Sequence, residues 1–242
     1  MTNVVDQNAR RLLGGIDREA DAFEVSEFAS LAARLQIWLL VGSLALRDDQ
    51  EANDSGAASA VNRSFLFAPD GAIAARYDKI HMFDVVLPDG ESWRESSVYK
   101  PGSSSVVAAT GIATFGLSIC YDLRFPGLYR RLSQSGAEIL TAPAAFTRQT
   151  GEAHWETLLR ARAIENGAYM IAPGQGGRHE DGRETYGRSM IVDPWGRILA
   201  SADHDEPGVI LASINLEAVR DARRAIPNLA LEKAPEIIKF TA

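Results

Sequence analysis

Hydrophobic and polar positions repeat along the chain with two different periods, and together they predict a mixed α/β fold. Over residues 24–35 the apolar side chains recur every three or four positions, which is the spacing of a helix with one buried face. Residues 37–46 form an almost unbroken apolar run, typical of a strand that is buried on both faces. A helix followed by such a strand predicts a sheet that helices cover.

Turn residues divide the next part of the chain into pairs of strands. A Pro-Asp-Gly turn at residues 69–71 separates residues 63–68 from 72–77, and a Thr-Gly turn separates residues 105–109 from 112–119. Both places predict a hairpin, because these residue types favour tight turns. The second hairpin ends directly before Cys120.

The remaining part of the chain alternates between helical and strand patterns. The segments predicted here are helices at 127–135, 151–166 and 216–225, and strands at 138–143, 168–172, in two stretches of 186–200, and at 208–214. This order, without a linker or an internal repeat, predicts a single α/β domain over residues 1–242.

Composition narrows the classes of partner. The chain of 242 residues is 46% hydrophobic, enough for one substantial core, and its formal net charge is -7. A negative balance argues against binding to nucleic acid or to an anionic membrane surface. The sequence contains no apolar run of about 18 residues and no apolar signal segment at its start. We therefore expect a cytoplasmic protein that handles small molecules.

Two residues at predicted strand ends are candidates for chemistry. Cys120 is the single cysteine, so it forms no internal disulfide and no cysteine metal cluster, and it is either a small core residue or a reactive thiol. Lys79 follows the strand at 72–77 and is either a solvated cation or part of a site. An ammonium near a thiol lowers the thiol pKa and stabilises the oxyanion formed when sulfur attacks a carbonyl. Amide hydrolysis also needs a base, which neither residue supplies.

The histidines offer one alternative for that base. The chain has four of them, His81, His154, His179 and His204, and the sequence does not say which approaches Cys120. A Cys–His hydrolase or acyltransferase therefore stays open. None of the histidines has a partner at i, i+4 spacing, so no zinc motif is indicated. The glycine-rich residues 174–177 lack the context of a phosphate loop and predict a rim loop.

Several segments in order resemble one family. The stretch YDKIHMFD at residues 77–84, the RES at 94–96 and the SICYDLRFP at 118–126 resemble the lysine, second-glutamate and cysteine signatures of the carbon–nitrogen hydrolase (nitrilase) superfamily of amidases. The segments at 150–166 and 186–196 are similar to the branch with deaminated-glutathione amidases and omega-amidases. The resemblance runs from residue 1 to about residue 229.

The resemblance implies a four-layer α-β-β-α sandwich, commonly a homodimer or higher oligomer, and an amidase that needs no cofactor and no metal. Carried over by position, Cys120 resembles the nucleophile that forms a thioester, and Lys79 resembles the cation that stabilises the oxyanion. The backbone N–H of Tyr121 would be the other oxyanion donor. Glu95 resembles the auxiliary carboxylate that orients Lys79 or the substrate amide.

The front of the chain departs from the family pattern. The family's general base is a glutamate that would fall one position before Met1, so we expect the chain to lack an N-terminal βαβ segment. An internal start, a naturally short inactive product or another carboxylate are the competing explanations, with Asp6, Glu19 and Glu24 as candidate substitutes. Arg188 stands where relatives tend to carry histidine, which predicts a retuned substrate-facing loop.

Two functions from different classes follow. The first is a thiol amidase that cleaves a small carboxamide, such as deaminated glutathione or the omega-amide of a 2-oxo acid, with release of ammonia. The second is a catalytically inactive binding or interaction protein on the same scaffold, motivated by the missing acid.

Overall fold

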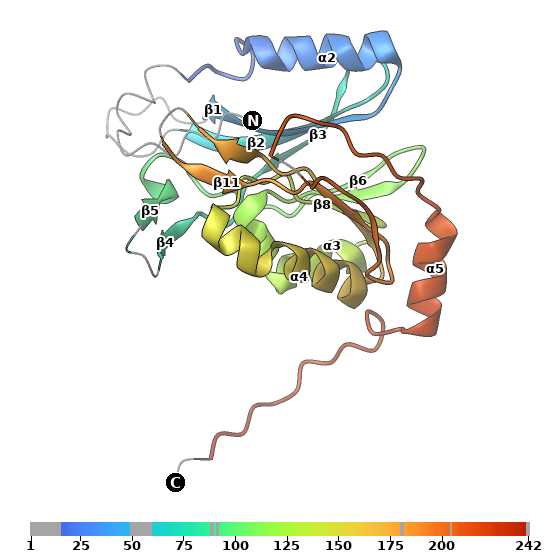
Figure 1. The fold of residues 1–242 in the computed structure, drawn as a ribbon. Helices are drawn as coiled ribbons and strands as arrows, with labels where there is room; N and C mark the ends of the chain where they lie inside the picture. Colours follow the sequence, from blue (N-terminus) through green and yellow to red (C-terminus); the bar gives the residue numbers. More distant parts are fainter. Residues whose placement is uncertain are drawn as a thin grey trace.

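The chain folds into four layers, in the order helix, sheet, sheet, helices (Figure 1). The computed structural model describes residues 16–48, 60–87, 90, 92–179, 182–203 and 205–240. The predicted α-β-β-α sandwich is confirmed over this part of the chain. The prediction that an N-terminal βαβ segment is missing concerns a part of the chain outside the described residues, and the candidate acid Asp6 also lies outside them.

The outer helix and the first sheet come from the first third of the chain. Helix α2 (Phe23–Leu35) packs Val25 and Ala32 against the apolar side chains of this sheet. The sheet is antiparallel, in the order β1 (Leu39–Arg47), β2 (Ala60–Phe67) and β3 (Ile73–Asp78). The predicted hairpin therefore forms, and Lys79 follows directly after its second strand.

The second sheet has six described strands in the order β13-β12-β9-β8-β7-β6. Their bounds are β6 (Val107–Ala109), β7 (Thr114–Gly116), β8 (Ile139–Thr141), β9 (Tyr169–Ala172), β12 (Met190–Val192) and β13 (Ile198–Ser201). Strands β7, β8 and β9 run parallel, and the other pairs are antiparallel. Binding sites in α/β sheets open at the carboxyl ends of parallel strands, and Cys120 follows β7.

Two helices cover the far face of the second sheet, and a third lies beside it (Figure 1). They are α3 (Pro126–Gln134), α4 (Arg148–Asn166) and α5 (Leu216–Ala225). Trp155 and Leu159 on α4 are fully buried in the main core. Gly151 lets α4 approach strand β11 (Glu184–Tyr186) closely, because a Cβ there would stand 2.2 Å from the Cβ of Tyr186.

Short elements complete the rim around Cys120. Strands β4 (Asp84–Val86) and β5 (Ser92–Arg94) pair, as do β10 (Gly176–Arg178) and β11 (Glu184–Tyr186). The short helices η1 (Glu95–Ser97) and η2 (Cys120–Arg124) carry three of the predicted site residues, Glu95, Cys120 and Tyr121. The glycine-rich rim loop is thus part of a hairpin.

The predicted strand at residues 208–214 is wrong. This segment is neither helix nor strand and pairs with no strand among the described residues, and Val209 and Leu211 are 86% and 84% exposed. A strand needs a neighbouring backbone to accept its hydrogen bonds, and apolar alternation alone does not supply one.

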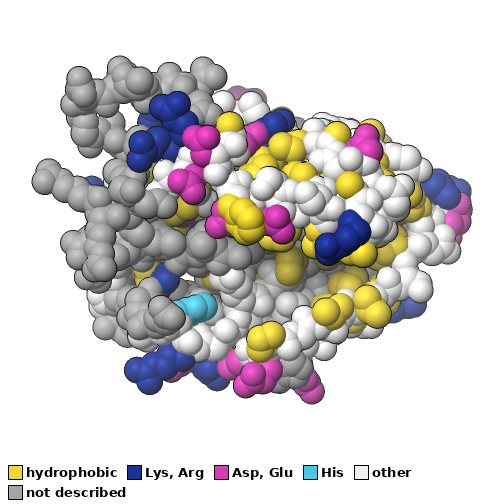
Figure 2. All heavy atoms as spheres, turned by 90° about the horizontal axis from the view of Figure 1, so that it is seen from above, with side chains coloured by type: hydrophobic (Ala, Val, Ile, Leu, Met, Phe, Trp, Pro, Cys, Tyr) yellow, Lys and Arg dark blue, Asp and Glu magenta, His cyan; other side chains and the backbone are white. Residues whose placement is uncertain are grey.

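Figure 2 shows hydrophobic side chains on both sides of a hollow on one face of the molecule. Within the described residues, no helix has the length and apolar character needed to cross a membrane.

Candidate active site

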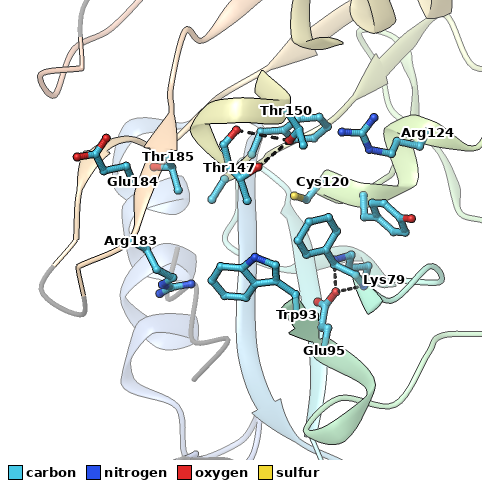
Figure 3. A pocket seen from close by; sticks show the side chains of 14 residues that line it. Lys79, Trp93, Glu95, Cys120, Arg124, Thr147, Thr150, Arg183, Glu184 and Thr185 are labelled. Carbon is cyan, nitrogen blue, oxygen red and sulfur yellow. Dashed lines mark hydrogen bonds and ion pairs between the residues drawn. The ribbon is translucent and has the colours of Figure 1, made fainter. Parts of the chain in front are cut away.

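One pocket brings together all four residues that the sequence predicts for the site. Lys79, Glu95, Cys120 and Tyr121 line a cavity of about 560 Å³, open mouth included. They come from the end of β3, from η1 and from η2, which are far apart in sequence (Figure 3). The sulfur of Cys120 and the side chain of Lys79 therefore face the same cleft.

The backbone turns sharply at Cys120. Its φ angle is +50°, in the left-handed region that non-glycine residues rarely adopt. The Cys120 N–H donates to the carbonyl oxygen of Pro143 at 2.9 Å, which ties this turn to the end of the neighbouring strand β8. A strained backbone held by its surroundings is a common feature of functional sites. Here Cys120 lines the pocket while it also packs against the core.

Lys79 and Glu95 form a buried ion pair in the pocket wall. The Lys79 Nζ lies 2.5 Å from Glu95 Oε2, and the two residues are 3% and 1% exposed. Glu95 also accepts the Phe83 N–H at 2.6 Å and the Asn62 amide at 3.1 Å. Burial is the largest single influence and works against the ammonium, but the charge and hydrogen bond of Glu95 outweigh it together with the negative charges of Cys120 and Asp122, so the pKa of Lys79 lies above its usual value. Lys79 is therefore a fixed cation and not a proton acceptor.

The thiol of Cys120 is held mainly as the neutral form. Burial raises the pKa of Cys120, because the thiolate is poorly solvated in the pocket. The Lys79 ammonium and a hydrogen bond from the Ala145 N–H act in the opposite direction. The same two groups stabilise negative charge in the pocket once it forms.

We expect alkylation of Cys120 to show this raised pKa. Because burial disfavours the thiolate, the rate of reaction with iodoacetamide should reach its half-maximum at a higher pH in the folded protein than in the urea-unfolded chain. Because the pKa of the Cys120 thiol is higher in the folded protein than in the unfolded chain, the thiol contributes to stability at pH values below the pKa of the unfolded chain. That contribution is lost as the pH rises through the pKa of the folded protein. The chain has one cysteine, so intact-mass kinetics report Cys120 alone. A folded midpoint at or below the unfolded one would contradict the prediction.

Aromatic rings form one wall of the pocket. The Tyr121 ring meets Phe83 edge-on, with centroids 5.0 Å apart, and meets Phe125 at 5.3 Å. Phe83 in turn lies against Trp93 at 6.3 Å. Such a wall excludes water around Lys79 and strengthens its field in the pocket. The role of the Tyr121 backbone N–H as an oxyanion donor stays a prediction.

Sequence reasoning gave no role to Arg124, although it lies in the cysteine motif. Arg124 is half-buried in the pocket wall, with its guanidinium 5.1 Å above the Phe146 ring and 3.2 Å from His154 Nδ1. Burial lowers the pKa of Arg124, yet a guanidinium remains protonated at neutral pH. No carboxylate pairs with it among the described residues. The sequence carried one indication of a role for Arg124, because this polar residue closely follows the apolar strand that ends before Cys120.

The opposite side of the pocket carries hydroxyl groups. Thr147, Thr150 and Thr185 line it, and the Thr147 and Thr150 hydroxyls are 2.8 Å apart. Arg183 lies over the Trp93 ring at 5.5 Å, so the β10–β11 and β4–β5 hairpins meet beside the mouth (Figure 3). The pocket thus has an aromatic wall and a wall of polar donors.

The three described histidines do not line this pocket. His81 bonds to Asp122, His154 lies near Arg124, and His179 Nε2 is 2.7 Å from the Thr185 hydroxyl. His204 lies outside the described residues. The Cys–His alternative therefore lacks a histidine at the thiol in the described part of the chain.

The other candidates also lie away from the thiol. Glu19 pairs with Arg63 and Arg76, and Glu24 is exposed on α2. Neither lines the pocket. Arg188 lines a separate cavity beside β9 and β12, and the Trp155 indole donates to its carbonyl oxygen at 2.7 Å. Arg188, which was predicted to lie on a substrate-facing loop, therefore does not line the Cys120 pocket.

Comparison with known proteins finds similarity over most of the chain. A family model described as carbon-nitrogen hydrolase matches residues 7–224. The chain is 45% identical over 202 residues to the deaminated glutathione amidase of Synechocystis sp., covering 83% of this chain and 72% of that protein. It is 43% identical over 205 residues to the deaminated glutathione amidase of Mus musculus, covering 84% of this chain and 62% of the mouse protein.

A solved structure shares the fold. The crystal structure of the C. elegans NitFhit protein superposes with a TM-score of 0.79 at 38% identity, covering 88% of this chain and 51% of that one. The structure of Nit3 from Saccharomyces cerevisiae, described as a member of branch 10 of the nitrilase superfamily, gives a TM-score of 0.74 at 29% identity, with 88% of this chain covered and 72% of the yeast chain.

Proposed function

Because the chain belongs to the carbon–nitrogen hydrolase family, we propose that it hydrolyses the carboxamide of a small acid through a thioester on Cys120. One observation carries the proposal. The single thiol of the chain shares a pocket with a buried ammonium, Lys79, which its own carboxylate partner Glu95 holds in place. A nucleophile and a fixed positive charge are the two parts that acyl transfer from an amide requires.

The chemistry runs in two steps. Cys120 Sγ attacks the amide carbon, and the carbonyl electrons move to oxygen, where the Lys79 ammonium and the Tyr121 N–H stabilise the negative charge. The C–N bond then breaks, and the nitrogen leaves as ammonia or an amine with the proton that the thiol lost. Water attacks the resulting thioester, which releases the acid and returns the thiol. Glu95 keeps the ammonium oriented through both steps.

The substrate carries a carboxylate in this proposal. Arg124 is a half-buried cation in the pocket wall with no carboxylate partner among the described residues, so an anionic group of the substrate would complete it. The threonine hydroxyls opposite supply further donors for carbonyl and carboxylate oxygens. Relatives from Synechocystis sp. and Mus musculus are named deaminated glutathione amidases. Deaminated glutathione or the omega-amide of a 2-oxo acid fits both observations.

Arg124→Gln is expected to raise KM for acidic amides by about 10- to 100-fold, because a charge-assisted hydrogen bond contributes about 1.5–3 kcal/mol. Hydrolysis of a neutral analogue, the methyl ester of the same acid, should change little. The measurement is kcat/KM for both substrates. Arg160→Gln is the matched control, since Arg160 lies exposed on α4 and pairs with Glu156. An equal loss for both substrates would reject the carboxylate subsite.

The proposed function itself is tested by trapping the thioester. Because the chain has one cysteine, any acyl group on a thiol reports Cys120. Rapid quenching with acid during turnover of an omega-amide should show an intact mass increased by the acyl group, together with ammonia or amine release. Turnover without an acyl adduct, and without sensitivity to iodoacetamide, would overturn the cysteine mechanism.

A binding protein on the same scaffold is the second candidate. The motivating observation is that the pocket's two described carboxylates have other partners: Glu95 accepts from Lys79, Phe83 and Asn62, and Glu184 lies 3.9 Å from Arg148. Neither of these two carboxylates is hydrogen-bonded to the Cys120 thiol in the described part of the chain. Chemical rescue separates the two functions, because added formate should restore hydrolysis to an amidase that lacks only its base. Tight binding of 2-oxo acids with no hydrolysis in formate would favour the binding protein.

The wider expectations belong to this proposal as well. A single domain over residues 1–242, a homodimer or higher oligomer, cytoplasmic residence, and no role for nucleic acid or membrane all rest on the resemblance and on the net charge of -7. Light scattering coupled to gel filtration tests the oligomer, and a mass equal to the 26.2 kDa chain would reject it.

A further inference from the structure

Asp122 is a buried carboxylate that the proposed chemistry leaves without a role. Its residue is 0% exposed, and it accepts four hydrogen bonds, two on each oxygen. A carboxylate buried this completely is costly unless donors surround it. The four donors come from two separate parts of the chain, and each part carries one of the two groups proposed for chemistry.

One donor belongs to the turn that holds the thiol. The Ile119 N–H donates to Asp122 Oδ2 at 2.8 Å, while the Asp122 N–H donates back to the Ile119 carbonyl at 3.1 Å. These two bonds close a ring around Cys120, whose φ angle of +50° is unfavourable for a residue with a side chain. The ring therefore stabilises a backbone conformation that is unfavourable in isolation.

The other donors belong to the end of β3, on both sides of Lys79. The Tyr77 hydroxyl donates to Asp122 Oδ2 at 2.7 Å. His81 donates twice to Oδ1, from its backbone N–H at 3.1 Å and from its Nδ1 at 2.7 Å. Lys79 lies between these two residues, so its backbone is anchored to the cysteine turn two residues before and two residues after it.

We propose that Asp122 is a positioning residue, which sets the place of the Cys120 thiol relative to the Lys79 ammonium by bonding the cysteine turn to the end of β3. The inference rests on the proposed function, because it assigns these two groups to one reaction. The side chain of Asp122 does not line the pocket, so it acts through its neighbours.

A carboxylate is the side chain that fits these four donors. Two carboxylate oxygens offer about four lone-pair directions, whereas an asparagine side chain offers one acceptor oxygen and two N–H donors. In Asp122→Asn, at least one donor of the cluster would face an N–H group and lose its bond. A shift of about 1 Å between reacting groups costs on the order of 100-fold in rate.

The test compares two substitutions of His81. Asparagine places an N–H near the position of Nδ1, so His81→Asn keeps a donor for Asp122, while His81→Ala removes it. Both variants lose the ring, which stacks on Phe125 with centroids 3.5 Å apart, so their difference isolates the bond to Asp122. Tyr169→Phe is the control, because it removes a buried hydroxyl that bonds to the Asn215 carbonyl, away from the site.

We expect kcat to fall about 100-fold in Asp122→Asn and about 10-fold or more in His81→Ala, with KM within about 3-fold of the parent. His81→Asn should recover most of the loss, and Tyr169→Phe should keep full activity. The pH midpoint for alkylation of Cys120 should rise in His81→Ala and return in His81→Asn, because Lys79 moves away from the sulfur in the first. A purely structural role would lower Tm without moving this midpoint.

Two results would overturn the inference. One is equal activity and equal alkylation midpoints in His81→Ala and His81→Asn. The other is folded Asp122→Asn with unchanged kcat. If Asp122→Asn does not fold, the His81 pair still decides. If the parent protein hydrolyses no amide, the proposed function fails. The positioning role is then tested independently by comparing the pH midpoints for Cys120 alkylation in His81→Ala and His81→Asn.

Discussion

Cys120→Ala is expected to reduce amide hydrolysis to the uncatalysed background, a loss of at least about 10⁴-fold, because no other group in the pocket forms the thioester. The fold should be retained, since the substitution removes a single half-buried sulfur atom. Ammonia or amine release, measured beside a thermal melt, checks both parts. Hydrolysis that survives in this variant would reject Cys120 as the nucleophile.

Cys120→Gly is the matched variant for the strain at this position. It should be as inactive as Cys120→Ala but more stable, because glycine adopts a φ angle of +50° without the steric cost of a Cβ. A higher Tm for the glycine variant than for the alanine variant would show that the native turn stores strain. A lower Tm would mean that this φ angle is not strained.

Glu95→Gln is expected to have the second large effect, on both stability and activity. Lys79 is 3% exposed and would lose its only anionic partner in the pocket wall that the structure describes, so the free energy of unfolding should fall by about 3–5 kcal/mol. The ammonium would also lose its orientation, and kcat/KM should fall by about 100-fold or more. Urea denaturation and steady-state kinetics measure the two quantities.

The sign of the pH dependence distinguishes this cause from a simple loss of packing. Without Glu95, burial dominates and the pKa of Lys79 drops below its unfolded value, so the folded variant binds fewer protons than the unfolded chain. Its stability should therefore rise as the pH approaches the unfolded lysine pKa of about 10.4, and the deficit against the parent should shrink over the same range. A deficit that stays constant over this range would contradict the uncompensated charge.

The double variant Lys79→Met with Glu95→Gln supplies the control. Removing both charges should restore most of the lost stability, since a buried ion pair replaced by apolar groups is often neutral or stabilising. It should not restore hydrolysis, because the oxyanion would lack its cation. Recovered activity in the double variant would show that Lys79 is not needed for chemistry.

The sequence alone determined the four α-helices that the structure describes and the family. The apolar period predicted the helix at 216–225 at its observed bounds and the helix at 24–35 to within one residue, because side chains three and four apart share one helix face. The ordered motifs around Lys79, Glu95 and Cys120 indicated a carbon–nitrogen hydrolase, which the family match confirms. These features are local, so they can be read from neighbouring positions.

The tertiary structure alone decided how separate segments meet. It brought Asp122 to Tyr77 and His81, left Arg124 without a described carboxylate partner, kept the described histidines out of the Cys120 pocket, and left residues 208–214 without a described strand partner. The bonds of Asp122, for example, join residues that are 45 and 41 positions apart in the chain. Periodicity reports which face of an element is buried, but it carries no record of which other side chain that face will meet, because the partner is selected by the shape of the whole core.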